Sequence, residues 1–390
     1  MLHTGIDFSK LKSENKAFTN PRAVILVNGQ DLIVKNPDLA ISQLCVDLTS
    51  GFEASVASFR IYGIFDRNMG EYKVKDYSKF IAIGSAIEIG MGYREKIKTV
   101  FVGVITMVSF VYDDSGLPYI VVTAMDVKAL MMANNHSRQL AATTVGAAVK
   151  EIFDSDPYSG LVGDKSIIRD VIVGATPDEP ALAPGAAPPA PSTEEKPTIE
   201  MVGESDYEFV VKMAKKVNFD FFVSTGKVIF RSAKADTANM MTLKPENILR
   251  SFDISYDITG QVGKIEVRAT DTDKGEQITS STKISNKWSL GNAAGSLVKN
   301  HVMTYLDPSV HTKAEADMRL NYLVENTTFR FGTLNCETLG LAELLPGKFI
   351  KVHGLGKELN NRFYVRRVKH IMSKKGEYKC VIEGSAAMIK

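Results

Sequence analysis

The chain has 390 residues, of which 44% are hydrophobic and 24% charged, and its formal net charge at pH 7 is +2. This length fits two or three domains with ample core, and the ordinary composition argues against general disorder. Because basic and acidic residues are spread along the chain without a basic block, nucleic acid is not expected as the main partner.

The sequence shows neither a membrane span nor a signal peptide, and this predicts where the chain folds. No apolar run approaches the roughly 18 residues of a membrane span, and the N-terminus has neither the charged start nor the apolar core of a signal peptide. We therefore expect synthesis and folding in a cytosol, without a membrane span. Cys45, Cys336 and Cys380 are far apart and include no CxxC pair, which predicts buried free thiols.

The first segment, residues 1–135, is rich in predicted strands. Asn28-Gly29, between Ala23 to Val27 and Asp31 to Lys35, predicts a tight hairpin, because both central residues of such a turn need positive φ. Alternation of apolar and polar residues predicts further strands at 44–49, 59–62, 86–93, 100–110 and 119–124, the last two around a turn at 113–116. Gly90 and Gly92 indicate a bend or bulge. Such a series predicts an antiparallel barrel or sandwich.

A smaller module is predicted at residues 136–235. Thr144 can cap a helix whose apolar stripe is Val145, Ala148, Val149 and Ile152. Ser205 and Glu208 form a capping box before a second helix, whose stripe is Phe209, Val210, Met213 and Val217. Residues 220–223 and 227–230 flank Ser224-Thr225-Gly226, which predicts a hairpin.

Residues 176–198 differ in composition from the rest of this module. They hold half of the 14 prolines, mixed with Ala, Gly and Glu. Such a segment buries too little apolar surface to offset its ordering entropy, so we expect an extended, mobile loop, which is most simply an insertion at a surface turn.

The last segment, residues 236–390, is predicted to be a second β domain. Alternation predicts strands at 252–258 and 264–268, and a capping box at Thr312 and Glu315 begins a helix over 312–325 with the stripe Ala316, Leu320, Leu323 and Val324. After the break at Leu345-Pro346-Gly347, strands at 348–352, 362–368 and 378–382 predict an antiparallel meander. Tyr378, Cys380 and Ile382 should share its buried face.

No motif predicts catalysis, a cofactor or a metal. The sequence has no HExxH, phosphate loop, Gly-x-Ser-x-Gly elbow or Rossmann glycine series. His353 and His370 lie in adjacent predicted strands, but no third ligand can be named. The paired carboxylates Asp154/Asp156 and Asp271/Asp273 lie in polar turns, where Asp serves backbone geometry. Gly354-Leu355-Gly356-Lys357 is too short for a phosphate cradle, and Trp288 is interpreted as a half-buried anchor.

Three stretches nevertheless resemble a known family. They are Glu204 to Phe209 leading into Phe219 to Val223, residues 329–382, and Ala86 to Tyr93 followed by Val100 to Ile105. The pattern of Glu-Ser-Asp, an aromatic residue, a helix and an aromatic strand is the most specific of them. Together they resemble phage late control protein D, the family of baseplate hubs of contractile tails, which includes the hub part of type VI secretion spike proteins.

The resemblance implies a β-rich α+β fold, with two tail-tube-like antiparallel β-barrel domains and the small helix-plus-hairpin module between them. It implies a non-enzymatic hub: a homotrimeric, pseudo-sixfold ring that joins a hexameric tail tube to a trimeric spike. The expected partners are the tube, spike and baseplate wedge proteins, with the tape measure protein as a further candidate. The particle would be a phage tail, a tailocin or a related extracellular injection particle.

One departure from the family accompanies this expectation. The secretion-type proteins continue into an oligonucleotide/oligosaccharide-binding domain and a needle, whereas this sequence ends after the meander, so the spike is expected to be a separate polypeptide.

Two alternatives stay open at this point. One is a tail-associated cell-wall hydrolase or peptidase, which would need an acid/base or metal constellation. The other is a receptor- or carbohydrate-binding tail module, which exposed aromatic clusters on one edge would favour.

Overall fold

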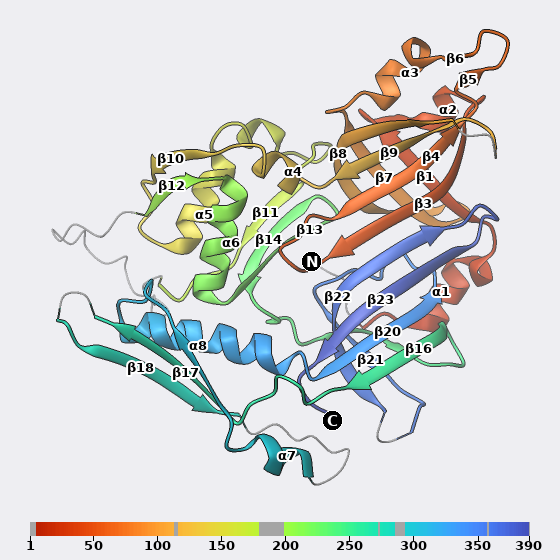
Figure 1. Ribbon diagram of the computed structural model, residues 1–390. Helices are drawn as coiled ribbons and strands as arrows, with labels where there is room; N and C mark the ends of the chain where they lie inside the picture. The colour runs from red at the N-terminus through yellow and green to blue at the C-terminus, as the bar shows by residue number, and fades with distance from the viewer. Residues whose placement is uncertain are drawn as a thin grey trace, which may run out of the picture.

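The computed structural model describes residues 5–112, 116–178, 199–271, 274–284, 293–356 and 359–389 (Figure 1). Its main element is a 13-stranded sheet to which both parts of the chain contribute. The N-terminal part supplies β1 (Pro21–Val27), β2 (Gln30–Asp31), β3 (Ala40–Thr49), β4 (Val56–Tyr62), β7 (Ala86–Tyr93), β8 (Lys96–Val111) and β9 (Tyr119–Met125). The C-terminal part supplies β15 (Asn239–Leu243), β16 (Leu249–Tyr256), β20 (Gly332–Leu339), β21 (Phe349–Val352), β22 (Asn361–Met372) and β23 (Tyr378–Ala386).

The order across the sheet is β16-β20-β23-β22-β3-β4-β9-β8-β7-β1-β2, and β21 and β15 branch off beside β22. All of these pairs are antiparallel except β15 with β21. The predicted antiparallel, β-rich class is therefore confirmed. Among the described strands the sheet is open, and its two ends are β16 and β2.

The long strand β22 is where the sheet branches. Its first part, Asn361–Tyr364, pairs with β21, and its last part, Arg367–Met372, pairs with β3. A bulge between Val365 and Arg367 separates the two parts, and the N–H of Ser50 donates to the carbonyl of Arg366 at 2.9 Å. The two predicted β segments therefore share one continuous sheet instead of standing apart.

The N-terminal arm connects the same two halves. The N–H groups of Gly5 and Ile6 donate to carbonyls of β15, and α1 (Phe8–Glu14) and η1 (Lys16–Phe18) follow. Phe18 then packs on Tyr93, whose hydroxyl donates to the carbonyl of Gly340 at 2.9 Å. This arm covers the seam between β7 and the C-terminal meander.

The first hairpin is confirmed at its turn but not beyond it. Asn28 and Gly29 have φ values of 49° and 78°, as a tight turn requires. The expected strand from Asp31 to Lys35 is wrong, because Leu32–Lys35 forms the short helix α2. The Asp31 carboxylate accepts from the N–H groups of Ile33 and Val34 at 3.0 Å, so it acts as a helix cap.

The middle module has both predicted helices and the predicted hairpin. Its elements are α4 (Lys128–Met131), β10 (His136–Gln139), α5 (Val145–Asp154), η2 (Ser159–Leu161), β11 (Asp170–Val173), β12 (Glu200–Glu204), α6 (Asp206–Val217), β13 (Phe219–Ser224) and β14 (Lys227–Ser232). Thr144 caps α5, and Ser205 with Glu208 forms the capping box of α6. Both apolar stripes are buried in a core of their own.

The predicted mobile loop at 176–198 lies mostly outside the described residues. Its start is ordered, which the composition did not predict. Thr176 is buried and accepts from the N–H of Gly146, and Asp178 accepts from the N–H of Val145 at 2.7 Å. These contacts satisfy the first turn of α5, so residues 176–178 belong to the folded module.

A third unit was not predicted as such. β17 (Lys264–Thr270), β18 (Gln277–Lys283) and β19 (Val302–Leu306) form a separate sheet, whereas we expected residues 264–268 to belong to the second β domain. Helix α8 (Lys313–Thr328), with the predicted capping box, lies along this sheet (Figure 1). Its Ala316, Leu320 and Leu323 pack against Ile265 and Val267, and the short helix α7 (Ala293–Val298) precedes β19.

Lys128 joins the middle module to the main sheet. It is fully buried, and its Nζ donates to the carbonyls of Gly51, Phe52, Glu53 and Phe221 at 2.9–3.2 Å. Burial lowers the pKa of Lys128 to about 8, against the opposing effect of Asp126, so the ammonium is charged at neutral pH. One cation thereby satisfies the loop after β3 and the strand β13 at once.

We expect Lys128→Met to lower the free energy of unfolding by about 3–5 kcal/mol, because four carbonyls lose their donor and buried Asp126 loses its counter-charge. Chemical denaturation measures the difference. Lys150→Met, on the exposed side of α5, is the matched control. Equal stability of the two variants would contradict the role given to Lys128.

His370, in β22 of the main sheet, is a further buried ionisable group. Its Nε2 donates to the carbonyl of Leu344 at 2.9 Å, so its Nδ1 accepts from the hydroxyl of Tyr378 at 2.8 Å. Burial lowers the pKa of His370 from 6.5 to about 4. The neutral imidazole therefore links β22, β23 and the segment before β21.

This shift predicts acid sensitivity. Between pH 6.5 and pH 4 the unfolded chain binds a proton at His370 that the folded chain does not, so the free energy of unfolding should fall by about 3 kcal/mol over this interval. Denaturation across the pH range should show that His370→Gln, which keeps a donor for Leu344, loses this contribution. Exposed His301→Gln should keep it; parallel curves for the wild type and His370→Gln would contradict the prediction.

Candidate functional site

The carboxylates and histidines singled out in the sequence do not converge. His353 is exposed after β21, whereas His370 is buried in the part of β22 that faces β3, so the possible histidine pair is not formed. In the described ranges, no three His, Cys, Asp or Glu side chains gather closely enough to hold a metal ion. No described helix has the length and apolar composition needed to cross a bilayer.

The remaining candidates behave as turn or core residues, or lie outside the described residues. Asp154 is exposed at the end of α5, and Asp156 accepts from the hydroxyl of Ser159 at 2.9 Å. Asp273, Trp288, Lys357 and the turn at 113–115 lie outside the described residues. Cys336 and Cys380 are buried free thiols, as predicted, and Cys45 is half-buried.

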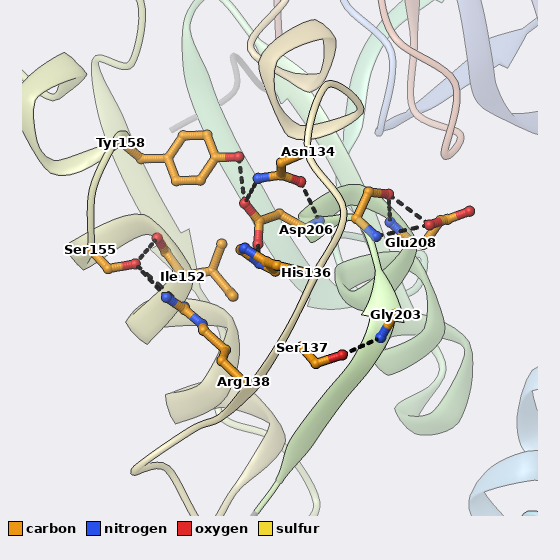
Figure 2. Close-up of polar contacts among 11 residues, drawn as sticks. Asn134, His136, Ser137, Arg138, Ile152, Ser155, Tyr158, Gly203, Asp206 and Glu208 are labelled. Carbon is orange, nitrogen blue, oxygen red and sulfur yellow. Dashed lines mark hydrogen bonds and ion pairs between the residues drawn. The ribbon is translucent and has the colours of Figure 1, made fainter.

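The Glu-Ser-Asp motif has a clear physical role, which the sequence alone did not show. Asp206, at the first position of α6, is buried and its carboxylate accepts from Tyr158 at 2.7 Å and from the side-chain amide of Asn134 (Figure 2). His136 contacts the other carboxylate oxygen at 3.0 Å, and Asn134 accepts from the N–H of Asp206. Burial and the neighbouring Asp206 raise the pKa of Tyr158.

We call Asn134, His136, Tyr158 and Asp206 the Asp206 cluster. Its hydrogen bonds connect three elements of the module. Asn134 and His136 lie at β10, Tyr158 follows α5, and Asp206 begins α6. A negative charge at a helix N-terminus is also stabilised by the helix dipole. The cluster positions α6, and α6 in turn places the hairpin β13–β14 against the main sheet.

A cleft of about 500 Å³ lies where the main sheet, the middle module and α8 meet. Two ion pairs lie in its wall: Arg367 contacts Asp47 at 2.6 and 2.8 Å, and Lys234 lies 3.1 Å from Glu325. The hydroxyl of Tyr364 donates to Asp220 at 2.7 Å. This arrangement suits a structural junction, since each of these carboxylates is held by a partner.

The outer end of the first β segment carries an exposed aromatic cluster. It consists of Phe65 in β5 (Phe65–Asp66), Tyr72 in β6 (Glu71–Tyr72), Phe110 and Tyr112, with ring centroids 5.1–5.6 Å apart. Phe110 is 48% and Tyr112 68% exposed. Sequence reasoning missed this cluster, because its members are up to 47 positions apart and only the fold of β5, β6 and α3 (Val74–Ile81) brings them to β8.

We expect Asp206→Asn to lower the free energy of unfolding by about 1–3 kcal/mol, because the uncharged amide weakens the hydrogen bonds from Asn134 and Tyr158 and has a donor in place of one of the two accepting oxygens. Asp154→Asn, at an exposed site without these contacts, is the control. In a double-mutant cycle with Tyr158→Phe, the two effects should be non-additive. Additive effects would show that the cluster does not act as a unit.

Comparison with known proteins supports the architecture and little beyond it. A family model described as the Alg8 N-terminal domain matches residues 190–374, less than half of the chain. This range omits β23 and the whole first β segment, so it does not delimit a folding unit here. No curated protein matches the sequence.

Solved structures match over almost the whole chain. A tail protein from Neisseria meningitidis MC58 has a TM-score of 0.65 at 12% identity, covering 94% of this chain and 97% of its own. The 43 kDa tail protein of prophage MuSo2 from Shewanella oneidensis has a TM-score of 0.65 at 13% identity, covering 93% and 98%. The E. coli c3393 protein, a type VI secretion component described as similar to the T4 tail proteins gp27 and gp5, has a TM-score of 0.52 at 11% identity, covering 94% and 76%. The chain thus shares the fold of these tail and secretion-system proteins.

Proposed function

We propose that this chain is a structural baseplate hub of a contractile injection system. The observation that carries the proposal is the structural match of nearly the entire chain to two tail proteins, over 93–94% of this chain and 97–98% of theirs. The pairing of ionisable groups at the central junction agrees with a mechanical role, since an attachment protein needs rigid joints and no turnover.

In this proposal, residues 1–135 and 236–390 act as two tube-like units, with residues 136–235 between them. Three copies form a pseudo-sixfold ring, in which the two units of each subunit face a hexameric tube while the ring as a whole matches a trimeric spike. Wedge proteins and the tape measure protein are further proposed partners. Assembly would end in a virion tail, a tailocin or a related particle.

The open ends of the main sheet support ring formation. Nothing in the described chain pairs with the outer edge of β16, and β2 covers β1 only at Leu26 and Val27. Phe252 of β16 is 42% exposed. Unpaired edges are aggregation hazards unless assembly covers them, and a closed ring would cover both ends in every copy.

Electron microscopy of assembled particles tests this function. We expect three copies at the junction of tube and spike, and we expect Phe252→Lys to reduce incorporation by about tenfold or more, because a charge on a sheet edge opposes strand pairing. Val202→Lys, which changes an exposed residue outside the main sheet, is the matched control. One or six copies at this position would overturn the ring.

A second candidate is a receptor- or carbohydrate-binding tail module, which the exposed aromatic cluster at Phe110 and Tyr112 favours. Such rings can stack on sugars or anchor a protein partner. The hub proposal places no glycan there. Glycan binding that is lost in Tyr112→Ala would therefore favour the second candidate over the first.

A further inference from the structure

The separate sheet β17–β18–β19 has one covered face and one exposed face. On the covered side, Ile265 and Val267 pack under α8, and Ser280 donates to Asp317 of that helix. On the other side, Arg268, Lys283, Val302, Thr304 and Leu306 are exposed and Lys264 is half-buried. A sheet normally buries one face and can leave the other to solvent, but here the solvent face is not neutral or evenly polar.

The strand register arranges this face in rows. Lys264 lies opposite Lys283 on one side and beside Val302 on the other. Two positions further along, Glu266 lies between Ser281 and Thr304, and Arg268 then lies between Thr279 and Leu306. We call Lys264, Arg268, Lys283, Val302, Thr304 and Leu306 the basic sheet face.

The carboxylate on this face, that of Glu266, is already paired with two cations of the same face. Glu266 is buried and accepts from Lys264 at 2.8 Å and from Arg268, and these hydrogen bonds lower its pKa. Lys283 has no ion-pair partner among the described residues. The face thus carries three cations, Lys264, Arg268 and Lys283, and a single carboxylate, Glu266. Its net charge is therefore positive.

Two features of the face cost stability in the isolated chain. Like charges placed directly opposite each other on neighbouring strands destabilise a sheet, and Lys264 faces Lys283 in this way. Val302 and Leu306 are 53% and 79% exposed beside these cations. A partner that supplies carboxylates and apolar side chains would remove both costs together.

We propose that the basic sheet face is a docking surface for an acidic protein segment that presents carboxylates and an apolar side chain on one and the same face. The apolar side of the face, Val302 and Leu306, favours a protein over nucleic acid, which would need mainly phosphate contacts. Such a segment would set carboxylates against Lys264 and Lys283 and an aliphatic side chain against Leu306. This proposal does not depend on the hub ring, because β17–β19 lie outside the main sheet.

A designed peptide tests the surface directly. The probe is a peptide of about twelve residues in which glutamates and one valine occupy every second position, with threonine between them, so that the glutamates and the valine share one face of an extended strand. We expect the 390-residue chain to bind it, to bind the same peptide with lysine in place of glutamate at least about tenfold more weakly, and to lose affinity as salt rises. Fluorescence anisotropy measures all three, and failure to prefer the acidic peptide would overturn the proposal.

Substitutions locate the binding. Lys283→Glu and Leu306→Ser should each weaken binding by about tenfold, while Lys150→Glu, an exposed control on α5, should leave it unchanged. Lys283→Glu should also leave the melting temperature equal or higher, because it removes a like-charge pair. This second measurement separates lost binding from lost folding. Unchanged affinity in both variants would overturn the proposal.

Two further arms address the other possible occupants. A DNA duplex and vesicles containing anionic lipid are tested under the same conditions with the same variants. Tighter binding of either one than of the acidic peptide, sensitive to Lys283→Glu, would assign the face to nucleic acid or membrane and overturn its assignment to protein.

Discussion

The pairing of β22 with β3 is the constraint on which the rest of the structure depends. It joins residues 367–372 to residues 44–49, so the last part of the chain completes a sheet begun by the first part. The bulge after Val365 allows this, because it turns one strand from the β21 side to the β3 side and leaves the carbonyl of Arg366 for Ser50. Contacts at such sequence separation form late and slowly, and they bind both β segments into one cooperative unit.

The position of the middle module then follows from two buried charges. Lys128 fixes the loop after β3 and the strand β13 through one ammonium, and Asp206 fixes the start of α6 through donors from β10 and from Tyr158. Buried charges are a costly way to gain stability, since each must be fully compensated by its partners. Their contribution here is geometric: the three N–H groups of one ammonium are shared among four carbonyls, which restricts how the segments that supply these carbonyls can be arranged.

Local signals in the sequence predicted local structure well. The capping boxes at Ser205 and Thr312 and the turn at Asn28-Gly29 depend on residues a few positions apart, and all three are confirmed. The strand expected at Leu32 failed for a reason of the same kind, because the capping role of Asp31 was not recognised. A structural feature that depends on residues within one helical turn or one tight turn can therefore be predicted from the sequence.

The pairing between strands that are far apart in the sequence could not be predicted. Alternation shows which residues share a face, but not which strand lies alongside. The pattern at 264–268 was read correctly as a strand, yet nothing local shows that it pairs with β18 and β19 under α8 instead of joining the main sheet. For the same reason His353 and His370 could be placed in neighbouring strands and still not meet, and the donors to Asp206 could not be named from the motif that contains it.

The distribution of satisfied and unsatisfied groups bears on what kind of protein this is. Inside the molecule, the buried charges Lys128 and Asp206 have their full set of partners, which leaves them rigid and chemically quiet. Among the described residues, three exposed features lie on separate parts of the surface: the free edge of β16, the aromatic ring of Tyr112 and the ammonium of Lys283. In the proposed hub, each of these surfaces would contact a different neighbour, and the three differ in chemistry: backbone donors and acceptors on the strand edge, aromatic rings, and a positive charge. Such differences allow each surface to select which neighbour binds where.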